Sequence, residues 1–191
     1  MGLQLTAPPA VEPVTVNEAK AHLRIDHGDE DALIASFIAT SRLQIEAALN
    51  LALITQSWSW RFDSWPDDKV VRLPLRPVQS IDAVQITAAD GTVETIPPER
   101  LLLDGASLPA RLVSTAGAFP RPGAAALGID VAFTAGYGSA ATDVPAPIRQ
   151  AVLMLTAHWY EHRQAAEFGG VSARIPEAVS VLLMPYRMVR L

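Results

Sequence analysis

The sequence predicts an α+β fold, in which a small helical bundle formed from both chain ends carries an inserted antiparallel β meander. Near both ends, apolar residues recur every three or four positions, which is typical of amphipathic helices. Between residues 57 and 134 they alternate with polar residues, which is typical of half-buried strands. We therefore expect an N-terminal helical part (1–56), a β-rich insertion (57–134) and a C-terminal helical part with a tail (135–191), packed as one compact unit.

Two helices are expected in the N-terminal part. Thr15 and Glu18 fit a capping box, in which each side chain satisfies a backbone N–H that the first helical turn leaves unpaired, so a short helix follows at about 16–25. Acidic residues then open a longer helix, at about 29–50, where they favour the positive end of the helix dipole. Its apolar face comprises Leu33, Ile34, Phe37, Ile38, Ser41, Ile45 and Leu49. Residues 1–13 are rich in proline and are expected to be extended, outside any sheet ladder.

The middle of the chain has the two-residue period of β-strands. Trp58, Trp60 and Phe62 alternate with polar residues, and Ala89-Asp90-Gly91 between two apolar runs is typical of a hairpin. Further short strands follow up to a strand at 129–133, and the stretch 114–128 is expected to be a loop. We expect each strand to pair with its neighbours in the sequence, as in a meander.

The second helical block begins near Pro145 and Pro147, because a proline in the first helical turn loses no hydrogen bond. Ile148, Val152, Leu155 and Trp159 form a single apolar stripe. We expect Trp159 to lie in the bundle core against the long N-terminal helix. Pro185 is expected to interrupt a short terminal helix, leaving an apolar, irregular tail suited to binding a partner.

Composition restricts the possible functions. The chain has 191 residues, a net charge of −5 and no cysteine, which excludes disulfides and thiolate zinc sites. No cluster of basic residues appears, so tight binding of DNA through its phosphates is disfavoured. No apolar run reaches the roughly 18–20 residues that span a bilayer, and no secretory signal is recognised at the N-terminus. We expect a protein made in the bacterial cytoplasm, with no membrane partner and no cofactor.

One motif suggests an enzyme. His158, Glu161 and His162 fit the pattern H-x-x-E-H, in which two histidines on one helical face bind zinc and the glutamate acts as a base. Such a site needs a third ligand from another element, and only Glu167 and Glu177 follow downstream. A packing role for His158 is the favoured interpretation, and a zinc-dependent hydrolase remains the alternative. A generic β-type binding module that uses Trp58, Trp60 and Trp65 is a third possibility.

Taken together and in order, the motifs resemble those of the head–tail connector (adaptor) proteins of long-tailed bacteriophages and gene transfer agents. The motifs are EPVTVNEAKAHLRID, DEDALIASFIATSRLQIE, LITQSW, LPLRPVQSI, FTAGYG, VPAPIRQAVLMLTAHWYEHR and LLMPYR. They cover nearly the whole chain. Some members of this family are labelled as DNA-packaging proteins.

The resemblance implies a structural protein of the virion neck and no enzyme. Such connectors form a homo-oligomeric ring, usually of twelve copies, beneath the portal protein. They offer a platform to a stopper or tail protein, and DNA passes through the axial channel without specific binding. In this family the C-terminal segment docks onto the portal. The residues of this chain that would do so are Leu182, Leu183, Tyr186, Arg187, Met188, Arg190 and Leu191.

Overall fold

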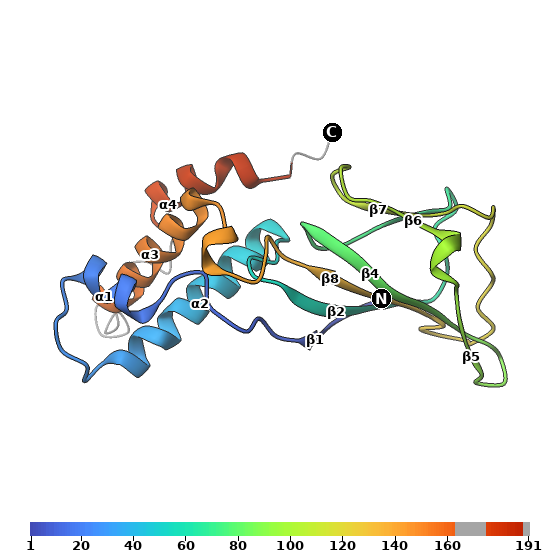
Figure 1. Ribbon diagram of the computed structural model, residues 1–191, viewed down its shortest axis with the longest axis horizontal. Coiled ribbons are helices and arrows are strands. Elements are labelled where there is room, and N and C mark those ends of the chain that lie inside the picture. The colour runs from blue at the N-terminus through green and yellow to red at the C-terminus, as the bar shows by residue number, and fades with distance from the viewer. Residues whose placement is uncertain (163–174, 189–191) are drawn as a thin grey trace, which may run out of the picture. The chain divides into compact units, whose positions relative to one another are not determined.

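A computed structural model describes residues 1–162 and 175–188 (Figure 1). The chain forms two compact units rather than one. The β unit contains Met1–Ala10 and Thr55–Tyr137, and the helical unit contains Val11–Ile54 and Gly138–Leu191. The backbone therefore passes from one unit to the other three times, after residues 10, 54 and 137. The expectation of an α+β fold is confirmed.

The β unit is built on a five-stranded antiparallel sheet. Its strands, from edge to edge, are β1 (Gly2–Ala7), β2 (Gln56–Phe62), β8 (Ile129–Ala135), β4 (Val78–Thr87) and β5 (Val93–Thr95). One face of this sheet is apolar, because the side chains of Ile129, Val131 and Phe133 on β8 are fully buried. The intervening Asp130 and Thr134 lie on the opposite, polar face, where Asp130 accepts hydrogen bonds from side chains of β2.

A smaller sheet covers part of the apolar face. It consists of β3 (Val70–Arg72), β7 (Arg111–Ser114) and β6 (Leu101–Asp104), the last preceded by the short 3-10 helix η1 (Pro98–Arg100). The side chains of Val71 and Leu112 are fully buried. Residues of β4 and of β6 line the same cavity, which places β6 over the β4 side of the large sheet.

The predicted meander is wrong in its strand order. A meander would place β8 at one edge, whereas β8 lies in the middle and pairs with β2 on one side and β4 on the other. The most uniformly apolar strand gains most from this central position, because its side chains are then covered from both sides. The residues between β7 and β8 form the expected loop, which lets β8 reach the centre.

The N-terminal residues also differ from the prediction. Gly2–Ala7 is not a free extended stretch but pairs with β2 as an edge strand, with Leu3 opposite Trp60 and Leu5 opposite Trp58. The prolines that disfavour a ladder begin at Pro8, so every residue of β1 keeps its backbone N–H.

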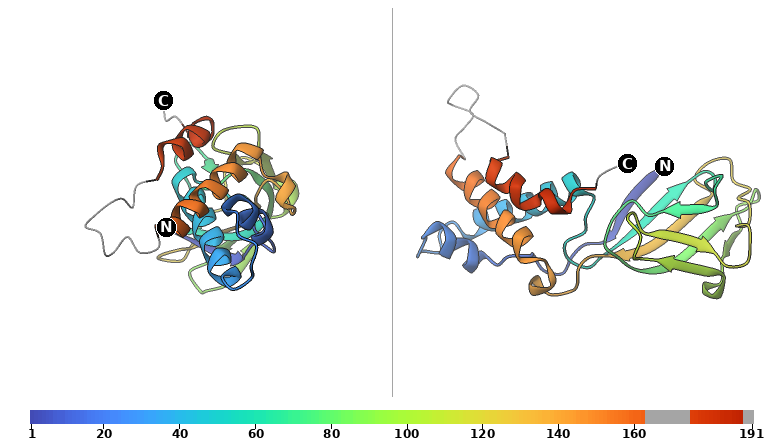
Figure 2. Two further views of the ribbon diagram at one scale, coloured as in Figure 1. Left: turned by 90° about the vertical axis from the view of Figure 1, so that its left-hand side faces the viewer. Right: turned by 90° about the horizontal axis from the view of Figure 1, so that it is seen from above.

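Four α-helices are described in the helical unit: α1 (Val16–Leu23), α2 (Asp31–Leu49), α3 (Ala146–Glu161) and α4 (Glu177–Leu183). The capping box before α1 is confirmed, since the Glu18 N–H donates to Thr15 Oγ1 over 3.1 Å and the Thr15 N–H donates to Glu18 Oε2 over 2.7 Å. Helix α3 contacts both α1 and α2, and α4 packs on α3 (Figure 2).

The core of the helical unit follows most of the predicted stripes, although Leu33 and Phe37 of α2 are only half-buried. Ile34, Ile38 and Ile45 of α2 are buried, as are Ile148, Val152 and Leu155 of α3. Trp159 is only half-buried and lies edge-on to the His158 ring, so its predicted place in the core is wrong. The buried face of α3 ends with Leu155 and Thr156 because the helix reaches its last turn soon afterwards.

By length and composition alone, α2 would be long and apolar enough to cross a membrane. The core helix of a bundle passes the same test. Since α2 buries its apolar face against neighbouring helices, this is weak evidence for a span.

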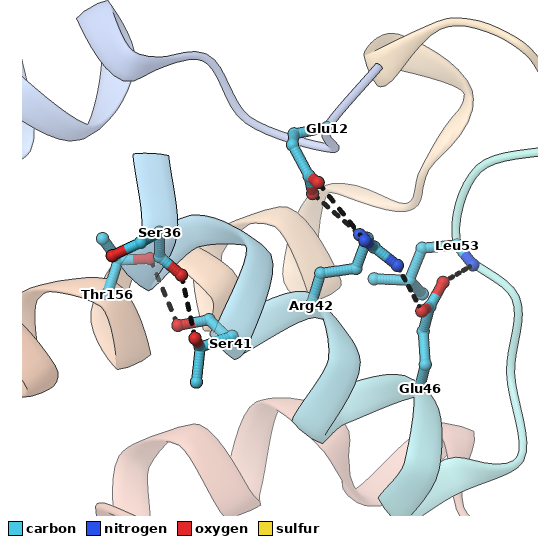
Figure 3. A network of polar contacts seen from close by, with 8 residues as sticks. Glu12, Ser36, Ser41, Arg42, Glu46, Leu53 and Thr156 are labelled. Atoms are coloured by element: carbon cyan, nitrogen blue, oxygen red, sulfur yellow. Dashed lines mark hydrogen bonds and ion pairs between the residues drawn. The ribbon is translucent and has the colours of Figure 1, made fainter. Parts of the chain in front are cut away.

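A buried ion-pair network fixes the segments on either side of α2 (Figure 3). Arg42 donates to Glu12 over 2.8 Å and to Glu46 over 2.7 Å, and Glu46 also accepts the backbone N–H of Leu53 over 2.8 Å. Burial alone would lower the pKa of Arg42, but the hydrogen bond that Arg42 donates to Glu12 and the charge of Glu46 outweigh it and raise this pKa. The network joins the chain before α1, the middle of α2 and the chain that follows α2.

We predict that Arg42→Ala lowers the free energy of unfolding by about 3–5 kcal/mol, because it leaves the buried Glu46 carboxylate without its charged partner. Chemical denaturation monitored by circular dichroism measures this change. The matched control is Arg72→Ala, which removes another i,i+4 ion pair, that of Arg72 with Asp68, whose side chains are about half exposed. This control substitution is expected to leave the free energy of unfolding nearly unchanged. Equal effects of the two variants would contradict a structural role for the network.

Candidate protein-binding surface on the C-terminal segment

Helix α4 is anchored to the helical unit by one face. The carbonyl of Pro176 accepts the N–H groups of Val179 and Ser180, over 3.0 and 3.2 Å, and so starts the helix. Val179 and Leu183 lie four residues apart, hence on one side of α4, and both are buried. The segment is therefore held against its own unit, where α3 is its neighbour.

The opposite side of α4 presents apolar side chains to solvent. Val181 is 57% exposed and Met184 is 61% exposed, and their spacing of three residues brings them to the same side of the helix. Arg187 follows one turn later and is also exposed. We call Val181, Met184 and Arg187 the C-terminal surface. Two exposed apolar side chains beside a cation suit a partner that offers an apolar pocket with an acidic rim.

The predicted irregular tail is wrong as far as residue 186. Met184–Tyr186 forms a 3-10 helix that continues directly from α4, and the N–H of Arg187 donates to the carbonyl of Met184 over 3.2 Å. Pro185 does not break this turn, because it occupies one of the first helical positions, where an N–H would have no helical partner.

The predicted docking residues fall into different environments. Leu183 is buried in its own unit, so it cannot contact a partner while α4 stays in place. Leu182, Tyr186 and Met188 are half-buried, and Arg187 is exposed. Arg190 and Leu191 lie outside the described residues. The sequence prediction omitted Val181 and Met184, although the buried pair Val179 and Leu183 at helical spacing indicates which side of α4 faces outward.

The three residues of the zinc motif are close together but do not form a metal centre. His158 is half-buried and His162 is exposed, with ring centroids 4.4 Å apart. The Nδ1 atom of His162 lies 2.9 Å from the carbonyl oxygen of His158, a hydrogen bond along the helix. Glu161 is exposed. Within residues 1–162 and 175–188, no three His, Cys, Asp or Glu side chains are grouped so as to hold a metal. Of the two predicted third ligands, Glu167 lies outside these residues.

The chain was compared with known proteins. It matches the family described as "Head completion protein" over residues 12–189. A search of curated proteins found no match.

Among solved structures, similar chains come from the neck of an empty gene transfer agent particle computed with C6 symmetry (TM-score 0.84), the virion of a native gene transfer agent particle (0.85) and the neck of a native particle computed with C12 symmetry (0.81). Each shares 26% sequence identity, and each alignment covers 100% of this chain and 97% of the other.

The family match spans most of the chain, and the structural likeness extends over both units. The resemblance to the head–tail connector family is thereby confirmed, whereas the zinc-hydrolase alternative is not supported. The chain belongs to the head completion protein family and is a structural protein rather than an enzyme.

Proposed function

We propose that this chain is a head–tail connector of a phage or gene transfer agent virion. Made in the cytoplasm of the bacterial host, it assembles into a homo-oligomeric ring of twelve copies beneath the portal. The ring joins the capsid to a stopper or tail-side neck protein and leaves an axial channel through which DNA passes.

One observation carries this proposal. The likeness to chains from gene transfer agent particles covers the whole of this chain at 26% identity, so it includes both the helical unit and the β unit. One of these relatives comes from a neck with C12 symmetry, which supports a ring of that order for this chain. A small fold shared by many functions would support much less.

The electrostatics fit a channel through which DNA moves freely. The net charge is −5. In the described part of the chain, six basic side chains each contact a carboxylate: Lys20, Arg42, Arg61, Arg72, Arg111 and Arg149. A cation already paired with a carboxylate offers little net attraction to phosphates, so these six side chains do not hold the genome strongly.

The C-terminal surface is our candidate for the portal contact. Its apolar side chains are exposed on a helix that the buried Val179 and Leu183 hold in place, so little ordering of α4 is needed on binding. The terminal residues Arg190 and Leu191 are proposed to extend this contact, with the arginines facing acidic groups of the portal.

The ring is tested by native mass spectrometry and negative-stain electron microscopy of the full-length protein, alone and mixed with its portal. We expect closed rings of twelve copies, at least when the portal is present. A protein that stays monomeric with the portal, and is absent from purified particles, would contradict the proposed function.

Replacing Val181 and Met184 together by glutamate is expected to abolish binding to portal-bearing heads, because it places charges in an apolar contact. Co-sedimentation with the heads measures this loss. The matched control replaces two exposed residues of α2, Leu43 and Ala47, by glutamate and should bind normally. Deleting residues 186–191 should likewise leave a folded protein that no longer binds.

Leu183→Ala serves as a comparison that changes the stability of the fold and leaves the exposed C-terminal surface unchanged. Because Leu183 is buried, the substitution should lower the free energy of unfolding by about 2–5 kcal/mol, whereas the double glutamate variant should melt like the wild type. Normal head binding by the double glutamate variant would remove the C-terminal surface from the portal contact.

The isolated protein should not bind duplex DNA tightly. We expect no submicromolar affinity at physiological salt in a fluorescence anisotropy titration, because the net charge is −5 and the sequence contains no run of lysines and arginines. Tight binding that weakens steeply as salt is added would show instead a surface that holds phosphates.

Protein purified without chelator is expected to contain less than one zinc per chain by elemental analysis, because the described residues offer the two neighbouring histidines no third ligand and a pair of histidines alone holds the metal weakly. The informative comparison is His162→Ala. Stoichiometric zinc that disappears in this variant would restore the metal-site hypothesis.

A further inference from the structure

The two borders of the five-stranded sheet are protected to very different extents. At one border, β1 contains no charged residue and no proline; its register is regular from Gly2 to Leu5 and shifts once, between Leu5 and Ala7. At the other border, β5 has only three residues and carries Glu94, and β4 has two register irregularities. Natural sheets protect an edge with charges, prolines, bulges or short strands unless another chain covers it. In the described residues, nothing pairs with the outer side of β1.

The apolar face of the sheet runs as far as the unprotected edge. Strand register aligns two rows of side chains across it. One row contains Leu3, Trp60, Val131 and Val84, and the other contains Leu5, Trp58, Phe133 and Ile81. The β8 residues of each row are fully buried, whereas Leu3 and Leu5 are both 39% exposed. The buried fraction thus decreases from β8 towards β1, and the leucines of β1 still expose apolar surface that a neighbouring chain could cover.

At the opposite border, part of β4 has no pairing strand on its outer side among the described residues. Strand β5 pairs with β4 only at residues 85–87, and Ile96 donates to the carbonyl of Val84. Among the described residues, the stretch 78–83 of β4 therefore has β8 as a partner on one side only. A cavity of about 280 Å³ lies beside this stretch. Its lining includes apolar side chains of β4 (Ile81, Val84), of β6 (Leu101, Leu103) and Ile96, together with the polar Ser80, Asp82 and Thr95.

We propose that β1 of one copy of this chain pairs with the open stretch of β4 (residues 78–83) in the next copy, so that the sheet continues from subunit to subunit. The side chains of Leu3 and Leu5 then fill the cavity beneath β6. This inference rests on the proposed function, since it names the contact between neighbours in the ring.

Two features of the sheet favour pairing of β1 with β4 of the next copy: the directions of the strands and the face on which their apolar side chains lie. The strands β1, β2, β8 and β4 alternate in direction, so β1 of a neighbour related by a small rotation runs antiparallel to β4. Leu3 and Leu5 lie on the same face of the sheet as Ile81 and Val84, so the apolar face also continues across the junction. The two register irregularities in β4 bend the strand and restrict the pairing to a few residues.

A contact between two different surfaces of the same chain can repeat without limit. Such a head-to-tail arrangement closes into a ring when the rotation between neighbours permits. Pairing of β1 with a second β1 would instead stop at a dimer. The two arrangements therefore predict different products when neighbouring copies are cross-linked.

The absence of cysteine makes cross-linking specific. We would introduce Gln4→Cys in β1 together with Ser80→Cys or Asp82→Cys in β4. The two β4 positions lie two residues apart, so they test two registers of the pairing between β1 and β4. Within one copy the two positions are separated by three strand spacings, about 14 Å, whereas a disulfide needs Cα atoms within about 7 Å. Any bond between β1 and β4 therefore joins two copies.

Mild oxidation of the assembled double-cysteine protein should give a ladder of dimers, trimers and larger species on a non-reducing gel. Reduction should convert all of these species to monomer. Each single-cysteine variant should give dimers at most. A double variant that gives the same product as Gln4→Cys alone, or none, while electron microscopy still shows rings, overturns the inference and leaves the proposed function standing. Failure of the wild-type protein to assemble even with its portal overturns both.

A second pair of variants tests the leucines. Replacing Leu3 and Leu5 by lysine should raise the concentration required for half-assembly by about tenfold for each leucine. The matched control replaces Gln4 and Thr6, which alternate with the leucines, by lysine and should assemble nearly normally. Both proteins should melt like the wild type, because all four side chains are exposed in the single chain. Equal assembly by the leucine variant and its control would contradict the proposed cavity filling.

Discussion

The pairing of β8 with both β2 and β4 is the constraint on which the β unit depends. Its inward side chains, Ile129, Val131, Phe133 and Ala135, are all fully buried, and its pairing partners lie about 40 to 80 residues earlier in the sequence. Without β8 the strands β1 and β2 would form an isolated pair, which is marginally stable in water. The sheet is therefore completed only when the late part of the chain has joined the early part.

The helical unit depends on the same kind of long-range closure. Arg149 of α3 donates to the carbonyl of Pro13 over 2.9 Å and also pairs with Glu18, which takes part in the capping box of α1. The hydrogen bond from the Thr15 backbone, together with the charge of Arg149, lowers the pKa of Glu18. One local motif at the start of α1 is thus tied to a helix more than a hundred residues away.

Local signals in the sequence were sufficient to predict the elements, and less so their arrangement. The capping box at Thr15, the apolar face of α2 and the alternation around Trp60 all act within a few residues, so they are readable from one segment. The order of the strands depends on which apolar strand gains most from two neighbours, a comparison between distant segments. At the C-terminus, the burial of Leu183 and the exposure of Met184 depend on α3, which the local pattern does not contain. Which residues of the C-terminal segment are buried and which are exposed was therefore predicted less well than the presence of a helix there.

The three backbone passages between the β unit and the helical unit have a mechanical consequence. A tandem pair of domains is joined by one covalent linker, and tension along the protein then acts on that single strand of chain. Here the connections after residues 10, 54 and 137 act in parallel, so each carries a fraction of any force that pulls the units apart. A break in one connection also leaves two others holding the units together. Such redundancy suits a structural protein of the virion neck.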